Sequence, residues 1–399
     1  MKIEIHIIQP LPVNRMNTDR EGRPKTIPFG GYTRARISSQ AQKRAARMYT
    51  HEFALLTNEE YAWRTRHFTQ LLIGRLVEAG IDGTQAETLA MRGLSAIRFG
   101  HKENKENEDG LRLNEYLIFY TDRELNGFTD ALLKHRAEIL AATLPEVKVD
   151  AATAQPLKKL GSSSDTKRKL QSQYSKQVID DLERIFTTDR NLELALYGRE
   201  LADLPEGSVD GQVQVAHAIS VNHTPQTEDF FVAIDDRAPG AVSAGMIGSL
   251  GITAPTLYRV AAVNIGQLSR EVGSDPAAAR GARAFLEAFT LAMPSGGKNS
   301  YFSMTTPSFV LFRRVPLGSA LTLAPAFEEP VLPQRHRSLS ELAVERLDTY
   351  MRDVSIRFPQ VQRDRECCVN MTAYAFQSAA VLTNLNQAID YVLDGFGES

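Results

Sequence analysis

Apolar and polar residues alternate at the start of the chain, where Ile3, Ile5 and Ile7 are separated by Glu4 and His6. This two-residue period predicts a half-buried β-strand. Further strand-like runs occur at residues 213–221, 230–235, 257–266 and 309–312. Helical patterns occur at about 38–56 and 276–291, and a long loop rich in Pro, Gly and Asn covers residues 10–33. Irregular loops of that length in compact domains usually serve a function.

If two of the three strand-like runs between the helices belong to one sheet, the order is strand, helix, two strands, helix and strand. This is the ferredoxin-like order, which the sheets of RNA-recognition motifs also use. We therefore expect an α+β fold with a ferredoxin-like (RRM-type) palm. Residues 57–185 are mostly helical in pattern and predict a helical insertion. Residues 1–56 and 186–325 would then form the palm, and residues 326–399 a C-terminal part that packs on it.

Residues 29–40 combine a glycine pair, two arginines and a Ser-Ser pair, and a basic helix follows them. The glycines permit a tight turn or a close approach to a ligand, and Ser39 with Gln42 predicts a capping box. Residues 1–50 carry ten Lys or Arg against three acids. Because a helix N-terminus attracts anions, this pattern predicts a phosphate-binding surface. A solvated basic helix face is the alternative.

Four blocks of sequence support the first interpretation because they occur in a characteristic order. They are residues 29–45, 214–220, 229–236 and 294–301. Together they resemble the CasC-type backbone subunits of the type I-E CRISPR Cascade complex, which belong to the RAMP superfamily of RNA-binding proteins. The resemblance spans most of the chain, and four ordered blocks are much more specific than one basic helix.

The resemblance implies a structural subunit that polymerises along a CRISPR RNA, with about six nucleotides held by each of about six copies. Its partners would be the CRISPR RNA, target DNA through the guide, adjacent copies of itself and the other Cascade subunits. Those subunits are the large, small, guide-processing and 5′-handle-capping ones, and a helicase-nuclease effector would be an indirect partner. A RAMP-type endoribonuclease and a generic single-stranded RNA-binding protein remain alternatives.

The expected RNA contacts are basic and hydrogen-bonding residues near the glycine pair and in the glycine-rich turn at 296–300. That turn lacks the spacing of a nucleotide-binding P-loop. The expected contacts are Arg15, Lys25, Arg34, Arg36, Ser38, Ser39, Gln40, Lys43, Arg44, Arg47, Lys298, Asn299 and Ser300.

The resemblance also implies a thumb-like β-hairpin at roughly residues 198–225, which carries Arg199 and His217. Phe230 and Phe231 follow it. Neighbouring residues of a strand face opposite sides of a sheet, so one of these two rings is expected to stack on a base and the other to be buried.

Two further segments are unusual in charge. Residues 157–176 carry six Lys or Arg against Asp165, and we favour a solvated insertion over a nucleic-acid contact there. Residues 101–110 are equally polar and predict a solvated loop. Residues 325–399 carry eleven acids against seven bases, which indicates helical packing or a surface for a protein partner.

No catalytic residue, metal site or cofactor is expected. The two cysteines, Cys367 and Cys368, are adjacent, and the histidines lack the spacing of metal ligands. Some RAMP relatives cleave RNA. By analogy with them, Asp19 and His217 would be the catalytic residues to suspect in this chain. The charged N-terminus argues against a signal peptide, and no apolar run reaches the roughly 18–20 residues of a membrane span. We therefore expect a cytoplasmic protein with no membrane partner.

Overall fold

The computed structural model describes residues 1–99, 101–103, 112–114, 116–142, 171–234, 244–361 and 363–396. The chain forms two compact units. The sheet unit comprises Met1–Leu56 and Gln212–Ser399, and the helical unit comprises Thr57–Gly211. The helical unit thus extends past the boundary expected at residue 185, because Leu201 and Leu204 belong to its core.

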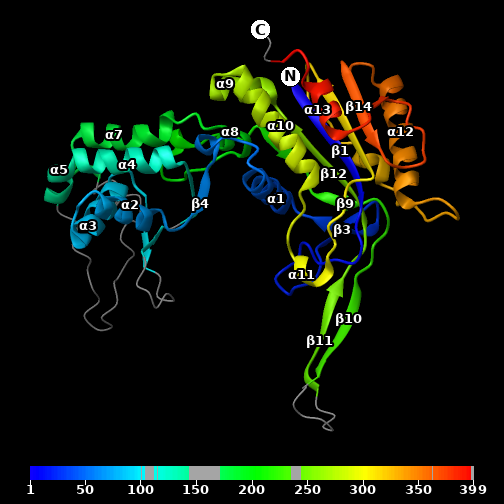
Figure 1. The fold of residues 1–399 in the computed structure, drawn as a ribbon, viewed down its shortest axis with the longest axis horizontal. Helices are drawn as coiled ribbons and strands as arrows, with labels where there is room; N and C mark the ends of the chain where they lie inside the picture. The colour runs from blue at the N-terminus through cyan, green and yellow to red at the C-terminus, as the bar shows by residue number, and fades with distance from the viewer. Residues whose placement is uncertain are drawn as a thin grey trace. The chain divides into compact units, whose positions relative to one another are not determined.

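The sheet unit is built on one large mixed sheet in an α+β fold (Figure 1). Its strand order is β15-β14-β13-β1-β12-β9-β3-β2, and β8 also pairs with β12. Every pairing is antiparallel except the parallel one between β14 and β15. The strands are β1 (Lys2–Pro10), β2 (Thr26–Phe29), β3 (Tyr32–Ile37), β8 (Val213–Val215), β9 (Ala218–Ser220), β12 (Thr256–Val263), β13 (Phe309–Val315), β14 (Arg365–Asn370) and β15 (Ala380–Val381).

Helices cover both faces of this sheet (Figure 1). The face that carries Ile8 and Tyr258 packs against Leu342 and Leu347 of α12. The opposite face carries Arg259, which contacts the end of α10, and α10 packs against α1. The helices are α1 (Ser39–Glu52), α9 (Ile265–Val272), α10 (Asp275–Leu291), α11 (Lys298–Tyr301), α12 (Leu339–Arg357) and α13 (Leu385–Leu393), with the 3-10 turn η3 (Ala324–Phe327) before α12.

Strand β1 is buried on both faces, which corrects the expectation of a half-buried strand. Glu4 and His6 are both fully buried. The Glu4 carboxylate accepts hydrogen bonds from Arg363 at 2.6 Å, from the Leu321 amide at 2.7 Å and from Arg313 at 3.3 Å. Burial raises the pKa of Glu4, but the contact with His6 and the charges of the two arginines outweigh it and lower the pKa to about 2. The polar residues that alternate with the isoleucines of β1 are therefore buried together with hydrogen-bond partners and are not exposed to solvent.

The helical unit packs around a cluster of aromatic rings. Phe68, Phe128 and Phe186 are buried at its centre, with ring centroids 5.8–6.4 Å apart. Its elements are η1 (Asn58–Glu60), β4 (Trp63–Thr65), α2 (Phe68–Glu78), α3 (Gly83–Ala96), β5 (His101–Glu103), β6 (Arg112–Asn114), β7 (Ile118–Tyr120), α4 (Asp122–Lys134), α5 (Arg136–Ala141), α7 (Lys176–Thr188), α8 (Leu192–Tyr197) and η2 (Pro205–Gly207). Most of the basic segment at 157–176 and of the polar loop at 101–110 lies outside the described residues.

A β-hairpin leaves the main sheet at residues 227–252, not at 198–225 as expected. Strands β10 (Thr227–Ile234) and β11 (Ala244–Ile252) form a separate two-stranded sheet (Figure 1). Within 198–225, Arg199 instead forms a bridge with Val209 in the helical unit, and β8 and β9 belong to the main sheet. The strand predicted at 230–235 is thus a hairpin strand and not part of the palm.

The glycine pair forms the turn between β2 and β3. Gly30 and Gly31 have φ values of +59° and +80°, a region that favours glycine. A Cβ on Gly30 would lie 1.7 Å from the backbone oxygen of Glu328, whereas one on Gly31 would meet nothing within 4 Å. The close approach that the sequence predicted is therefore an approach to the protein's own backbone and not to a ligand.

Gly30→Ala is expected to destabilise the sheet unit much more than Gly31→Ala. Each change adds the backbone strain of a left-handed non-glycine residue, about 1–3 kcal/mol, and only Gly30→Ala adds a clash with Glu328. Thermal melts of the two variants should show a clearly larger drop in Tm for Gly30→Ala. Equal drops would mean that the approach to Glu328 is not constrained.

Candidate nucleic-acid interface

Helix α1 begins one residue earlier than its predicted capping box. Ser38 is the N-cap, and its hydroxyl accepts a hydrogen bond from the Ala41 amide at 3.4 Å. Gln42 is 2 % exposed and turns into the core instead of closing a box with Ser39. Ser39 and Gln40 therefore lie in the first turn, next to the backbone N–H groups that have no partner within the helix.

The long loop at residues 10–33 connects Lys25 both to this helix end and to Arg36 of β3. The Asn17 carboxamide oxygen accepts a hydrogen bond from the Ser38 amide at 2.9 Å, and the Asn17 carbonyl accepts one from the Lys25 amide at 2.9 Å. The carbonyl of Lys25 in turn accepts the amide of Arg36 in β3. Asn17 therefore connects the loop to the start of α1 through hydrogen bonds. The sequence did not predict this role, because an Asn in a loop rich in Pro and Gly is not distinctive.

His217 lies beside the same group of residues. The Arg36 guanidinium donates to the Nδ1 atom of His217 at 3.0 Å. Burial, followed by the charges of Arg36 and Lys25, lowers the pKa of His217, which favours the neutral acceptor form at pH 7. His217 sits between β8 and β9 in the main sheet, so its predicted place in the thumb is wrong.

The glycine-rich turn at 296–300 packs against the same loop. A Cβ on Gly296 would lie 2.5 Å from the Met16 carbonyl oxygen, and one on Gly297 would lie 3.7 Å from the Cβ of Arg15. Gly297 has a φ of +66°, and Lys298, Asn299 and Ser300 follow it as exposed residues of α11. The missing side chains thus allow the turn to sit directly on residues 15 and 16.

Four separate segments therefore converge on one region, which we call the basic surface. It is half-buried at Arg15, Lys25, Arg36, Ser39 and Lys43, and exposed at its other members. The basic surface consists of Arg15, Lys25, Arg36, Ser39, Gln40, Lys43, Arg44, Lys298, Asn299 and Ser300.

Three expected contact residues, Arg34, Arg47 and Ser38, are buried and cannot meet a phosphate, and so is Arg199, which was expected in the thumb. Arg34 is fully buried and donates to the carbonyls of Ser220, Phe327 and Glu328. Arg47 is 6 % exposed, and Arg199 is buried in the helical unit at 2.6 Å from Glu124. Ser38, at 7 % exposure, serves as the helix cap. The sequence shows that a residue is basic, but its burial depends on the fold.

Comparison with known proteins decides the family. The model of the CT1975-like Cas proteins matches residues 3–393. The chain belongs to the CT1975-like family of Cas proteins. Its fold is similar to a chain of a solved "CRISPR RNA-guided surveillance complex, pre-nicking", with 27% identity, a TM-score of 0.78 and 98% of each chain covered. A chain of a second "CRISPR RNA-guided surveillance complex" shares the fold at 24% identity, with a TM-score of 0.70 and the same coverage. No curated protein matches the sequence.

In this CT1975-like chain the two hairpin phenylalanines face opposite sides, as their neighbouring positions predicted. Phe230 is 66 % exposed. Phe231 lies against the partner strand, where a Cβ on Gly248 would be 2.5 Å from its ring, but it is only half-buried, so the expectation that this ring is buried is wrong. Val232 and Ile247, paired across the hairpin, are also exposed, so Phe230 belongs to an open apolar face.

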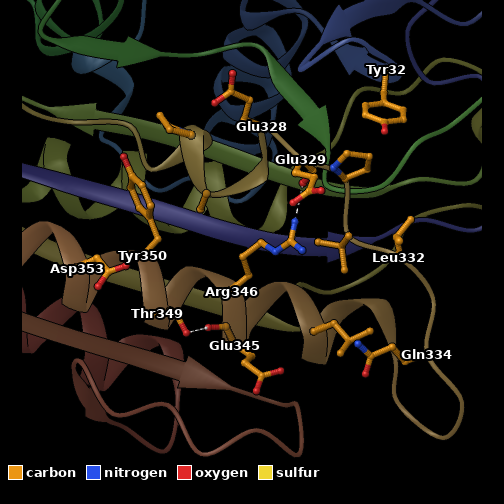
Figure 2. Close-up of a pocket in the computed structure, with 15 residues that line it drawn as sticks. Tyr32, Glu328, Glu329, Leu332, Gln334, Glu345, Arg346, Thr349, Tyr350 and Asp353 are labelled. Carbon is orange, nitrogen blue, oxygen red and sulfur yellow. Dashed lines mark hydrogen bonds between the residues drawn. The ribbon is translucent and has the colours of Figure 1, made fainter.

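A groove of about 790 Å³ lies on the α12 side of the sheet unit (Figure 2). One wall is a stripe of α12, and the other is formed by Tyr32 and residues 325–334. Arg346 donates to the Glu329 carbonyl, and the acids that line the groove are Glu328, Glu329, Glu345 and Asp353. This excess of carboxylates disfavours the binding of RNA phosphates in the groove.

The structure describes no cluster of three or more His, Cys, Asp or Glu side chains suited to a metal ion. Among the residues described, no helix combines the length and the apolar character needed to cross a membrane. Asp19 is exposed, and its carboxylate accepts the Arg23 amide at 2.9 Å within the loop. His217 has Arg36 as its partner, and both residues are thus engaged in local contacts.

Proposed function

We propose that this protein binds guide RNA as the backbone subunit of a Cascade-type CRISPR surveillance complex. The observation that carries the proposal is the basic surface, where cations from four segments gather near the first turn of α1, in which Gln40 is exposed. Helix N-termini and arginine or lysine side chains are the usual ligands of phosphates. Membership of the CT1975-like family of Cas proteins supports the proposal that this RNA binding takes place within a CRISPR complex.

The basic surface would hold the guide by its phosphates and leave the base edges free. Phosphate contacts fix the position of a nucleic acid but carry no sequence information. Target DNA would then be read by base pairing alone, as in other RNA-guided systems. The order β1, α1, β9, β12, α10, β13, with neighbours β13-β1-β12-β9, supports a ferredoxin-like palm as the platform.

Copies of the chain would lie head to tail along the guide, with about six nucleotides to each of about six copies. The β10–β11 hairpin is suited to act as the thumb that crosses the guide between neighbouring copies. The acidic groove along α12 is suited to a protein contact, with another copy or with one of the large, small, guide-processing or handle-capping subunits. Target DNA would be reached through the guide, and a helicase-nuclease effector would act on the assembled complex.

Phe230→Ala is expected to weaken RNA binding by about 5- to 150-fold, which corresponds to a lost base stack of about 1–3 kcal/mol. The ring is two-thirds exposed and is free to stack without rearrangement of the hairpin. Fluorescence anisotropy with labelled oligo(U) measures the effect. Val232→Ala, on the same exposed face, is the control and should change the affinity little. An equal loss in both variants would contradict stacking.

The proposal assigns no catalytic step to the chain. If the protein were instead a RAMP-type endoribonuclease, purified protein would cut a labelled RNA, and Asp19→Ala or His217→Ala would abolish the cleavage. We expect the RNA to remain intact with the parent chain and with both variants. Cleavage by the parent that is absent in either variant would replace the backbone assignment with the nuclease.

Co-expression with the neighbouring genes and the CRISPR array tests the proposed function directly. We expect a large particle that contains several copies of this chain and one discrete guide RNA. Mass photometry of the purified particle and sequencing of its RNA would establish both points. A monomer without nucleic acid would contradict the proposal. A monomer that binds RNA of any sequence would instead favour a generic single-stranded RNA-binding protein.

A further inference from the structure

Arg259 is a fully buried arginine at the centre of the sheet unit, on the opposite face from the acidic groove. It lies in β12, is 1 % exposed and stacks on the ring of Phe289 with 4.7 Å between guanidinium and centroid. Its hydrogen-bond partners are backbone carbonyls and side-chain amides rather than a carboxylate. Burying a charge in this way is costly unless its donors are fully used.

The five N–H groups of the guanidinium are matched by five acceptor oxygens. Three of these oxygens are the carbonyls of Phe289, Thr290 and Ala292 at the end of α10, at 2.5, 3.4 and 3.1 Å. These groups have no partner within the helix, and the negative end of the helix dipole favours a cation there. The guanidinium therefore fixes where α10 ends and where residues 292–305, which we call the strap, begin.

The same guanidinium also reaches the far end of the strap through Gln9. Its Nη1 atom donates to the Gln9 side-chain oxygen at 2.7 Å, and the Gln9 amide donates to the Thr305 carbonyl at 2.7 Å. The Thr305 hydroxyl then donates to the carbonyl of Pro10. Lys298, Asn299 and Ser300 lie on the strap between these two anchors.

A third link leads from Arg259 to the start of α1. The Nε atom donates to the side-chain oxygen of Gln42 at 3.3 Å. The Gln42 amide donates to the Ala216 carbonyl at 2.9 Å, directly before His217. One buried side chain thus connects the strap, the first turns of α1 and the segment that carries the partner of Arg36.

We propose that Arg259 is a positioning residue of the basic surface and holds its separate segments in register through Gln9 and Gln42. The inference rests on the proposed RNA binding. Only arginine supplies five donors in a fixed planar fork, whereas lysine offers three from a single atom. Arg259→Lys keeps the charge but leaves at least two of the five oxygens without a donor.

The first test measures local order without RNA. In Arg259→Lys, the hydrogen-bonded backbone amides of Lys298, Ser300 and Tyr301 in the strap should exchange with deuterium faster than in the parent chain. The same is expected of the amides of Ala41 and Gln42, which are bonded to Ser38 at the start of α1. Arg199→Lys is the matched control, since Arg199 is also buried and bonded to carbonyls but lies in the helical unit. Unchanged exchange at 296–301 and in α1 would overturn the inference, whether or not the protein binds RNA.

The second test measures binding of labelled oligo(U) over a range of salt concentrations. We expect Arg259→Lys to bind about tenfold more weakly, and the slope of log Kd against log salt to fall by about 0.7 for each phosphate that the variant no longer binds. Arg199→Lys should keep the parent's Kd and slope even if its Tm falls. A folded Arg259→Lys chain with the parent's Kd and slope would contradict the inference.

Gln42→Leu provides a second variant if Arg259→Lys does not fold. It cuts the links to α1 and Ala216 but leaves the contacts of Arg259 with α10 and Gln9 in place. Faster exchange of the amides at positions 41 and 42, which are bonded to Ser38, with unchanged exchange in the strap, is the expected result. Unchanged exchange in α1 would overturn the link. Failure of the parent chain to bind any RNA would contradict the proposed function, while the exchange data would still decide the role of Arg259.

Discussion

Arg44→Glu combined with Lys298→Glu is expected to weaken RNA binding by roughly a hundredfold at low salt and to reduce the salt slope by about 1.4. Both side chains are exposed and belong to different segments of the basic surface, so the double change replaces two cations by two anions. Each phosphate bound on a single strand contributes about 0.7 to the slope. Anisotropy titrations with oligo(U) at several salt concentrations measure both quantities.

Arg335→Glu combined with Arg352→Glu is the matched control. These two arginines are also exposed, and they lie just before α12 and within it, on the side of the acidic groove. The same change in net charge there should leave the affinity within a few-fold of the parent value. Equal losses of affinity in the two double variants would mean that overall charge, and not the basic surface, governs RNA binding.

These variants avoid Arg34 and Arg47 for a structural reason. Both are buried, so their reversal would destabilise the sheet unit and mimic a loss of binding. Arg44 and Lys298 have no such role in the core. A lower affinity at an unchanged Tm is therefore interpretable as a weaker interaction between the basic surface and RNA.

Glu4→Gln is expected to destabilise the sheet unit by about 3–5 kcal/mol, the usual effect of removing one partner from a buried ion pair. The change leaves the guanidinium groups of Arg313 and Arg363 buried beside a neutral amide. It also weakens the acceptor for the Leu321 amide. Thermal melts should show a large drop in Tm at pH 7.

The pH dependence of this effect follows from the direction of the pKa shift. The pKa of Glu4 falls from 4.5 to about 2 on folding, so the carboxylate stabilises the fold above pH 4.5. That stability is lost as the pH falls from 4.5 toward 2. The difference in Tm between the parent and Glu4→Gln should therefore shrink over this window.

Glu366→Gln is the control for the buried cluster. Glu366 also accepts a hydrogen bond from Arg313, at 2.6 Å, but its side chain is 24 % exposed. Water can replace part of its contact, so its change should cost much less than Glu4→Gln. If the two variants have the same Tm, the burial of Glu4 does not determine the stability of the cluster.

The sequence predicted many helices and strands of the sheet unit close to their observed bounds. The helices expected at 38–56 and 276–291 are found at Ser39–Glu52 and Asp275–Leu291. The strand at 257–266 is found at Thr256–Val263. Local periodicity suffices for such elements because the apolar face of a segment is visible in its own residues.

Strand β1 and the hairpin were misassigned because their environment depends on distant residues. The polar positions of β1 are buried only because Arg313, Arg363 and Tyr258 come to them from elsewhere in the chain. The run at 230–235 looked like a strand of the main sheet, but its described residues belong to β10, which pairs with β11 in a separate two-stranded sheet. An alternating pattern shows that a strand has two faces, not which partner covers each of them.

By itself the sequence determined the family, the mixed α and β composition and the concentration of positive charge near the N-terminus. These properties reside in local motifs, in their order and in residue counts. Only the tertiary structure decided which cations are exposed, since Arg44 faces solvent while Arg34 and Arg47 are buried. It also revealed Arg259 and its two glutamines, whose partners are separated by tens to hundreds of residues. Burial and long-range hydrogen bonds arise when distant segments pack together, and no local pattern encodes that pairing.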